Sequence, residues 1–147
     1  MIPAGRVLGF DLGERRIGVA VTDSSQAVAM AAATITRSGD EAADHGAMAG
    51  LVDEYEAVGV VVGLPLSLSG KPGPSAERVL EEVERLRVSL GVQVEMVDER
   101  FTTTVAASGL RASGRPARRQ RNFIDAAAAA ELLQTWLARR SATVGEV

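Results

Sequence analysis

Acidic residues at three separate places in the chain could do chemistry together. Asp11 falls inside an apolar run, Asp98 and Glu99 follow another, and Asp125 lies near the expected start of the last helix. An acid within an apolar strand is costly unless it is paired or bound to a cation. Carboxylate oxygens from a strand, a strand end and a helix start suit Mg²⁺ or Mn²⁺ rather than zinc. Two such ions about 3.5–4 Å apart activate water and stabilise the leaving oxygen of a phosphodiester. The pattern therefore indicates metal-dependent phosphodiester hydrolysis.

The two strand acids also have structural interpretations. Asp11 could pair with Arg15 or Arg16 or accept from turn amides, and Glu99 could pair with Arg100 at a solvated strand end. Because neighbouring side chains of a strand point to opposite faces, only one of Asp98 and Glu99 is expected to join Asp11.

Asp125 has a structural interpretation that is nearly as good as the functional one. If Asn122 caps the last helix, Asp125 occupies its third position, where free amides and the helix dipole favour a carboxylate. The alanine run at residues 126–130 favours the functional interpretation, because a face of small residues lets the helix approach the sheet.

Composition excludes several other chemistries. The chain of 147 residues has no cysteine, which removes disulfide scaffolds and thiol nucleophiles. His45, the single histidine, is expected to be a solvated helix residue. Aromatic residues make up 3%, too few for a platform that stacks bases. No apolar run is long enough to span a membrane and no secretory stretch is evident at the N-terminus, so a cytoplasmic protein is expected.

Positive charge is concentrated in one segment. Between residues 100 and 121 there is no acid, and the segment holds six arginines: Arg100, Arg111, Arg115, Arg118, Arg119 and Arg121. The whole chain carries a formal charge of −3, so removing these six charges leaves −9 on the remainder. A ligand within a Debye length of about 8 Å responds to the local patch rather than to the total. The segment is therefore a candidate nucleic-acid contact.

Hydrophobic patterning predicts the elements that must position these residues. Strand-like runs occupy residues 6–12, 16–22, 28–35, 58–66 and 92–97. Helical patterns occupy residues 40–57, 75–90, 101–112 and 123–140, with a loop leading to Arg121. The order predicts an α/β fold, a mixed five-stranded sheet with helices on both faces. We expect a single domain over residues 1–140 and a disordered tail at 141–147.

Four motifs follow one another along the chain: Phe10-Asp11-Leu12-Gly13 with Arg16-Ile17-Gly18-Val19-Ala20, Val61-Val62-Gly63-Leu64-Pro65-Leu66, Asp98-Glu99-Arg100-Phe101-Thr102-Thr103, and Ile124-Asp125-Ala126-Ala127-Ala128 with Leu133-Gln134. Taken together, they resemble the YqgF/RuvX family of Holliday-junction resolvase-like proteins and candidate pre-16S ribosomal RNA nucleases. They occur in family order and span most of the chain. The resemblance implies an RNase H-like fold with a metal-dependent nuclease site.

The resemblance also implies roles for individual residues. Asp11, Glu99 and Asp125 would be the catalytic metal ligands, with Asp98 as the substitute for Glu99. Family members usually carry lysines before the last acid, and here arginines stand in their place, which keeps the charge and adds bidentate phosphate contacts. Residues expected to contact nucleic acid are Arg16, Lys71, Arg100, Thr102, Thr103, Arg115, Arg118, Arg119 and Arg121.

The implied activity is hydrolysis of RNA phosphodiester bonds in 5′-end maturation of pre-16S ribosomal RNA, free or in a precursor particle. It would use two Mg²⁺ or Mn²⁺ ions when substrate is bound, in a monomer or weak homodimer. A branched-DNA resolvase is an alternative, although it needs two active sites and hence a dimer. A non-catalytic nucleic-acid-binding protein of the same fold is a second alternative. An actin-like ATPase, which also opens with an Asp-x-Gly hairpin, needs two lobes, and 147 residues hold one.

Overall fold

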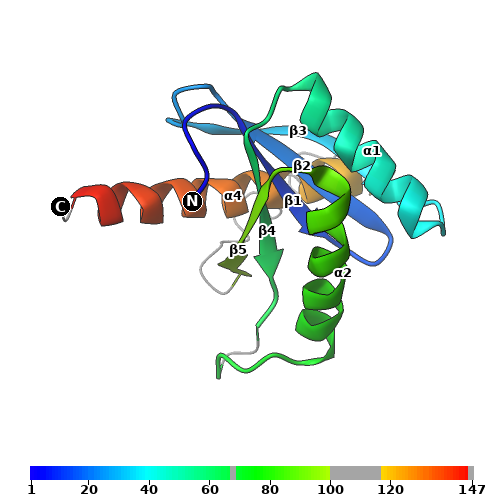
Figure 1. The fold of residues 1–147 in the computed structure, drawn as a ribbon. Coiled ribbons are helices and arrows are strands. Elements are labelled where there is room, and N and C mark those ends of the chain that lie inside the picture. The colour runs from blue at the N-terminus through cyan, green and yellow to red at the C-terminus, as the bar shows by residue number, and fades with distance from the viewer. Residues whose placement is uncertain (67–68, 100–116, 146–147) are drawn as a thin grey trace.

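A five-stranded sheet forms the centre of the molecule (Figure 1). The computed structural model describes residues 1–66, 69–99 and 117–145, and in the last helix it describes the side chains of residues 123–140. Along these parts of the chain the elements are β1 (Val7–Leu12), β2 (Arg16–Thr22), β3 (Ala29–Thr36), α1 (Glu41–Glu54), β4 (Gly59–Leu64), α2 (Pro74–Leu90), β5 (Gln93–Asp98) and α4 (Ala117–Gly145).

The sheet combines an antiparallel meander with a parallel half. The strand order is β3-β2-β1-β4-β5, in which β1, β2 and β3 are antiparallel neighbours and β1, β4 and β5 are parallel. A tight turn joins β1 to β2, closed by the amide of Gly13, which donates to the carbonyl oxygen of Arg16 at 3.0 Å. The predicted mixed five-stranded sheet is confirmed.

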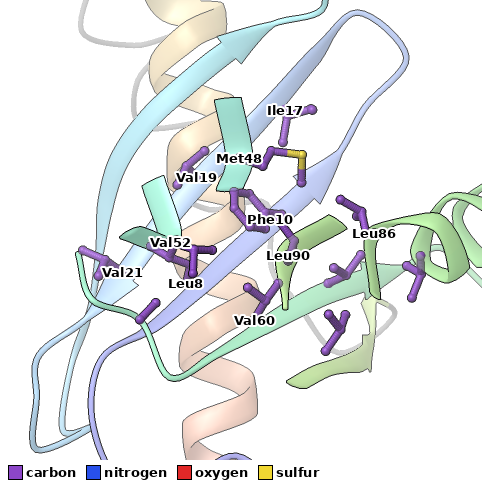
Figure 2. Packing of buried hydrophobic residues seen from close by; sticks show 14 of the residues in the cluster. Leu8, Phe10, Ile17, Val19, Val21, Met48, Val52, Val60, Leu86 and Leu90 are labelled. Atoms are coloured by element: carbon purple, nitrogen blue, oxygen red, sulfur yellow. The ribbon is translucent and has the colours of Figure 1, made fainter. Parts of the chain in front are cut away.

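Alternation along the strands divides the core into two layers. Phe10 of β1, Ile17 of β2 and Val60 of β4 face α1 and α2, where they pack with Met48 and Leu86 (Figure 2). On the opposite face, a second cluster packs against α4, made of Val7, Ala20, Val61, Val97, Ala129, Leu132, Leu133 and Trp136. Helices α1 and α2 therefore cover one face and α4 covers the other (Figure 1).

Helix α4 begins earlier than the sequence pattern predicted. It starts at Ala117, so the expected loop up to Arg121 and the expected cap at Asn122 are both wrong. Alanine, arginine and glutamine are strong helix formers, and a proline immediately precedes the helix in sequence, as is common at helix starts. Asp125 therefore lies inside the helix, away from its first turn. The helix continues to Gly145, through residues expected to be a disordered tail.

The other predicted elements match the observed ones to within a few residues at each end. The helix expected at residues 101–112 lies outside the described part of the chain. Within that part, no helix has both the length and the apolar character needed to cross a membrane.

Candidate active site

Asp11 and Glu99 lie at the edge of the sheet where the parallel strands β1, β4 and β5 end. In β1, Val7 packs against α4, and strand alternation places Asp11 on the same face. In β5 the alternation places Glu95 and Val97 on the α4 face, where Trp136 of α4 donates to Glu95 at 3.1 Å. Glu99, the residue after the end of β5, continues the same alternation. The same alternation places Asp98 on the opposite face of the sheet. Of the two neighbouring acids, Glu99 is therefore the one on the side of Asp11.

Gly63 of β4 makes the approach of Glu99 to Asp11 possible. Strand β4 lies between β1 and β5, so two spacings of about 4.8 Å separate the outer strands. The Glu99 side chain lies over Gly63, where an added Cβ would be 2.4 Å from Glu99 Oε1. Any other residue at position 63 would occupy the space that the Glu99 carboxyl uses. A glycine that interrupts a β-branched strand often marks a close approach, and this was the signal in the sequence that could have indicated a role for Gly63.

The Asp11 and Glu99 side chains are joined by a hydrogen bond. Burial, the negative charge of Asp11 and this hydrogen bond raise the pKa of Glu99 to about 8. Burial also raises the pKa of Asp11, and the charge of Asp125 adds to that effect, while the hydrogen bond from Glu99 opposes it. The raised pKa favours the protonated form of Glu99 at neutral pH, in which its carboxyl donates the hydrogen bond and the Asp11 carboxylate accepts it.

Asp125 reaches this site from α4, on the covering helix. Its backbone oxygen lies against Gly18 of β2, where an added Cβ would be only 1.9 Å from it. Gly18 is the direct partner of Asp11 in the β1–β2 ladder, so the close approach places Asp125 beside Asp11. Its carboxylate accepts a hydrogen bond from Arg16, the first residue of β2, at 2.5 Å. This role of Gly18 was not predicted from the sequence.

The donor set fits a hard divalent cation. Two carboxylates 4 Å apart repel by about 4 kcal/mol at an effective dielectric constant of 20. Burial and that repulsion together raise the pKa of Glu99, and a bound cation would offset both penalties. All three side chains offer oxygen, the ligand that Mg²⁺ and Mn²⁺ prefer.

A separate cluster joins α1 and α2, and it corrects the prediction for His45. The His45 ring is buried, and its Nε2 lies 2.8 Å from Glu82 Oε2. Glu41 completes a group whose candidate metal-ligating atoms lie within 4.8 Å of one another, the one such trio in the described residues. However, Arg37 donates to both Glu82 oxygens at 2.9 Å, and the Glu41 carboxylate accepts from an arginine of α2. These charges form an ion-pair network that ties the two helices together.

The structure describes only some of the predicted nucleic-acid contacts, among them Arg16, which pairs with Asp125. Lys71 is exposed in the segment between β4 and α2. Arg118, Arg119 and Arg121 lie in the first turns of α4, before Asp125 on the same helix, but their side chains are outside the described residues. The remaining predicted contacts lie wholly outside the described part of the chain: Arg100, Thr102, Thr103 and Arg115.

Comparison with known proteins places this arrangement in a family. Residues 5–139 match the model of the family described as RuvX, Holliday junction resolvase. A relative from Anaeromyxobacter dehalogenans strain 2CP-C, named as a candidate pre-16S rRNA nuclease, is 48% identical over 136 residues, covering 92% of this chain and 98% of its own. A relative from Rhodococcus opacus strain B4 with the same name is 46% identical over 144 residues, covering 95% and 81%.

The fold is shared with more distant structures. RuvC of Thermus thermophilus, solved in complex with a Holliday junction substrate, superposes with a TM-score of 0.56 at 16% identity, covering 93% of this chain and 96% of RuvC. A second structure of Thermus thermophilus RuvC gives a TM-score of 0.53. At this identity the likeness concerns the fold alone, and it bears out the RNase H-like architecture. The family match over nearly the whole chain, together with relatives at almost half identity, establishes that this chain belongs to the RuvX family.

Proposed function

We propose that this protein is a metal-dependent nuclease that hydrolyses RNA phosphodiester bonds in the 5′-end maturation of pre-16S ribosomal RNA. The observation that carries the proposal is the hydrogen-bonded Asp11–Glu99 pair, half-buried at the sheet edge with Asp125 alongside. Keeping two acids in contact where water is partly excluded is costly, and a cation-binding role accounts for it.

Asp11, Glu99 and Asp125 would hold the metal, Mg²⁺ or Mn²⁺, as two ions when substrate is bound. Bound there, the metal would lower the pKa of a water and neutralise charge on the phosphate. The chain's own residues supply the geometry. Gly63 leaves room for the Glu99 carboxyl, and Gly18 seats the α4 backbone so that Asp125 faces the same edge. Glu99 must lose its proton before it and Asp11 can both act as anionic ligands.

RNA is the substrate class we favour. The relatives at 46–48% identity are named for pre-16S rRNA, and the segment before Asp125 is rich in arginine, which pairs bidentately with phosphate. Such a role places the protein in the cytoplasm. A branched-DNA resolvase is the second candidate, because the matching family model is described by that activity.

Cleavage of a labelled 16S precursor RNA and of a four-way DNA junction, measured side by side with Mn²⁺, tests the proposal. We expect the RNA to be cut and the junction to be left intact by a monomeric protein. Preferential, symmetric cutting of the junction by a dimer would instead establish the resolvase.

Two neighbouring acids provide a matched pair of variants for the same assay. Glu99→Gln should abolish cleavage, because it removes a ligand beside Asp11. Asp98→Asn makes the same change from carboxyl to amide at the adjacent residue, on the opposite face of β5. This variant should retain cleavage. Equal loss in both variants would contradict the assignment of Glu99.

A further inference from the structure

Arg16 and Asp125 form an ion pair across the candidate site. Arg16 Nε lies 2.5 Å from Asp125 Oδ2, and the two residues are 109 positions apart in the chain. Their side chains are 28% and 23% exposed, so the pair lies at the mouth of the site rather than in the core. The contact links the β1–β2 hairpin to helix α4.

The backbone on both sides fixes this pair. Arg16 is the first residue of β2, where its carbonyl oxygen accepts from Gly13 and its main chain pairs with Thr36 of β3. Two residues later on the same face, Gly18 admits the backbone oxygen of Asp125. Strand β2 therefore contacts Asp125 at two points. Gly18 lies against the Asp125 backbone oxygen, and Arg16 donates to the Asp125 carboxylate.

This pairing keeps the three acids from converging. Asp11 and Glu99 are hydrogen-bonded to each other, whereas the Asp125 carboxylate is directed to Arg16. Within the described residues, the three acids do not form a group whose ligand atoms all lie within 4.8 Å of one another. For Asp125 to share a cation with Asp11, its carboxylate must give up at least part of the Arg16 contact.

We propose that Arg16 is a positioning residue that competes with the divalent cation for Asp125, and that the released guanidinium then binds a phosphate of the nucleic-acid substrate. The inference rests on the proposed nuclease function and adds to it an exchange of partners. A guanidinium and a divalent cation seek the same carboxylate oxygen, so occupancy by one disfavours the other. The planar fork of arginine suits a phosphate as well as a carboxylate.

The exchange predicts coupling between metal and substrate. A substrate phosphate gives the released guanidinium a new partner, which lowers the free energy needed to free Asp125. Metal therefore binds more tightly with substrate present, and by linkage the substrate binds more tightly with metal present. Without Arg16 this coupling should decrease, while metal affinity in the absence of substrate should increase.

Titration with Mn²⁺, following the free ion by electron paramagnetic resonance, measures the competition directly. A partly exposed ion pair contributes less than about 1 kcal/mol, so Arg16→Gln should tighten Mn²⁺ binding by about threefold. Arg16→Lys, which keeps the charge, should stay near the wild-type affinity and shows whether the position tolerates change. Arg78→Gln removes an exposed arginine paired with Glu14 of the β1–β2 turn and should leave the affinity unchanged.

A double-mutant cycle separates competition at Asp125 from a general effect of charge. In an Asp125→Asn background, Arg16→Gln should no longer change Mn²⁺ affinity, because the shared carboxylate is gone. A threefold gain that persists in that background would overturn the proposal. In the wild type, addition of Mg²⁺ should shift the Arg16 Nε–Hε resonance in NMR spectra, and an unshifted resonance at saturating Mg²⁺ would also overturn it.

The outcomes distinguish this inference from the proposed function. If wild-type protein binds Mn²⁺ in a manner that depends on Asp11 and Glu99, but Arg16→Gln leaves the affinity unchanged, the exchange is refuted and the nuclease proposal stands. If wild-type protein binds no Mn²⁺ at millimolar concentration, with or without RNA, both fail. Tighter Mn²⁺ binding combined with slower RNA cleavage in Arg16→Gln is the result that we expect, and a merely structural role would not produce it.

Discussion

Replacing Gly18 by alanine tests how the site is assembled, because it alters no acid. A Cβ at this position would lie 1.9 Å from the backbone oxygen of Asp125, whereas real Cβ contacts are essentially never shorter than 3.0 Å. The obstacle is backbone on both sides, so no side chain can rotate away. Strand β2 and helix α4 must therefore separate by about 1.1 Å at this point.

The expected loss of stability follows from overpacking. Inserting a methyl group into a filled interface costs about 1–3 kcal/mol. At about 2–4 °C per kcal/mol for a domain of this size, the melting temperature should fall by roughly 2–12 °C. The protein should still fold, because the two core layers contain many contacts away from Gly18.

The expected loss of activity is larger than the loss of stability suggests. The same displacement moves Asp125 away from Asp11 by about 1 Å, and a misplacement of that size can reduce a rate about 100-fold. Cleavage of precursor RNA, measured well below the melting temperature, should fall accordingly, with weaker Mn²⁺ binding.

Gly46→Ala provides the control for this experiment. Gly46 is exposed in α1 and nothing lies within 4 Å of its would-be Cβ. The substitution should stabilise the helix by about 0.5–1 kcal/mol and leave cleavage unchanged. If Gly18→Ala proved as stable and as active as wild type, the close approach of α4 to β2 would be refuted.

Three further predictions concern metal, salt and pH. Millimolar Mg²⁺ should raise the melting temperature through site occupancy, by an amount that is lost in Asp11→Asn; no rise in wild type would contradict the ligand assignment. Replacing Arg118, Arg119 and Arg121 by glutamine should weaken RNA binding and reduce its logarithmic salt slope by about 0.7 per lost phosphate contact; an unchanged slope would remove these arginines from the substrate path. Burial alone would raise the pKa of Glu82, but hydrogen bonds from Arg37 and His45 outweigh it and lower that pKa below 4.5. Ionised Glu82 therefore stabilises the folded state above pH 4.5, and this stabilisation is lost as the pH falls through the lowered pKa of the folded protein. Glu82→Gln should cost about 3 kcal/mol at pH 7 and less in acid; denaturant unfolding showing an equal loss at both pH values would refute this.

The sequence was sufficient for the sheet and for the face of each strand acid. Alternation places Asp11 on one face with Val7, and it separates Asp98 from Glu99, because a period of two needs no tertiary information. The positions of the strands followed from apolar runs bounded by glycine and proline.

The features that complete the site depend on tertiary contacts. The roles of Gly18 and Gly63 follow from what lies above them, a helix backbone and a side chain from another strand. The partner of Arg16 is 109 residues away, so sequence pattern could offer Asp11, a phosphate or solvent equally well. His45 was misjudged because its neighbours in α1 are acids and alanines, whereas its actual partner, Glu82, is in α2.

The most direct test of the central claim is RNA cleavage by Asp11→Asn, measured with Mn²⁺ and compared with its free energy of unfolding. The half-buried pair of acids exists to bind a cation rather than to stabilise the fold. We expect the variant to lose cleavage yet to be at least as stable as wild type at neutral pH, because a half-buried carboxylate beside Glu99 has been replaced by a neutral amide. Full cleavage activity in Asp11→Asn would contradict it.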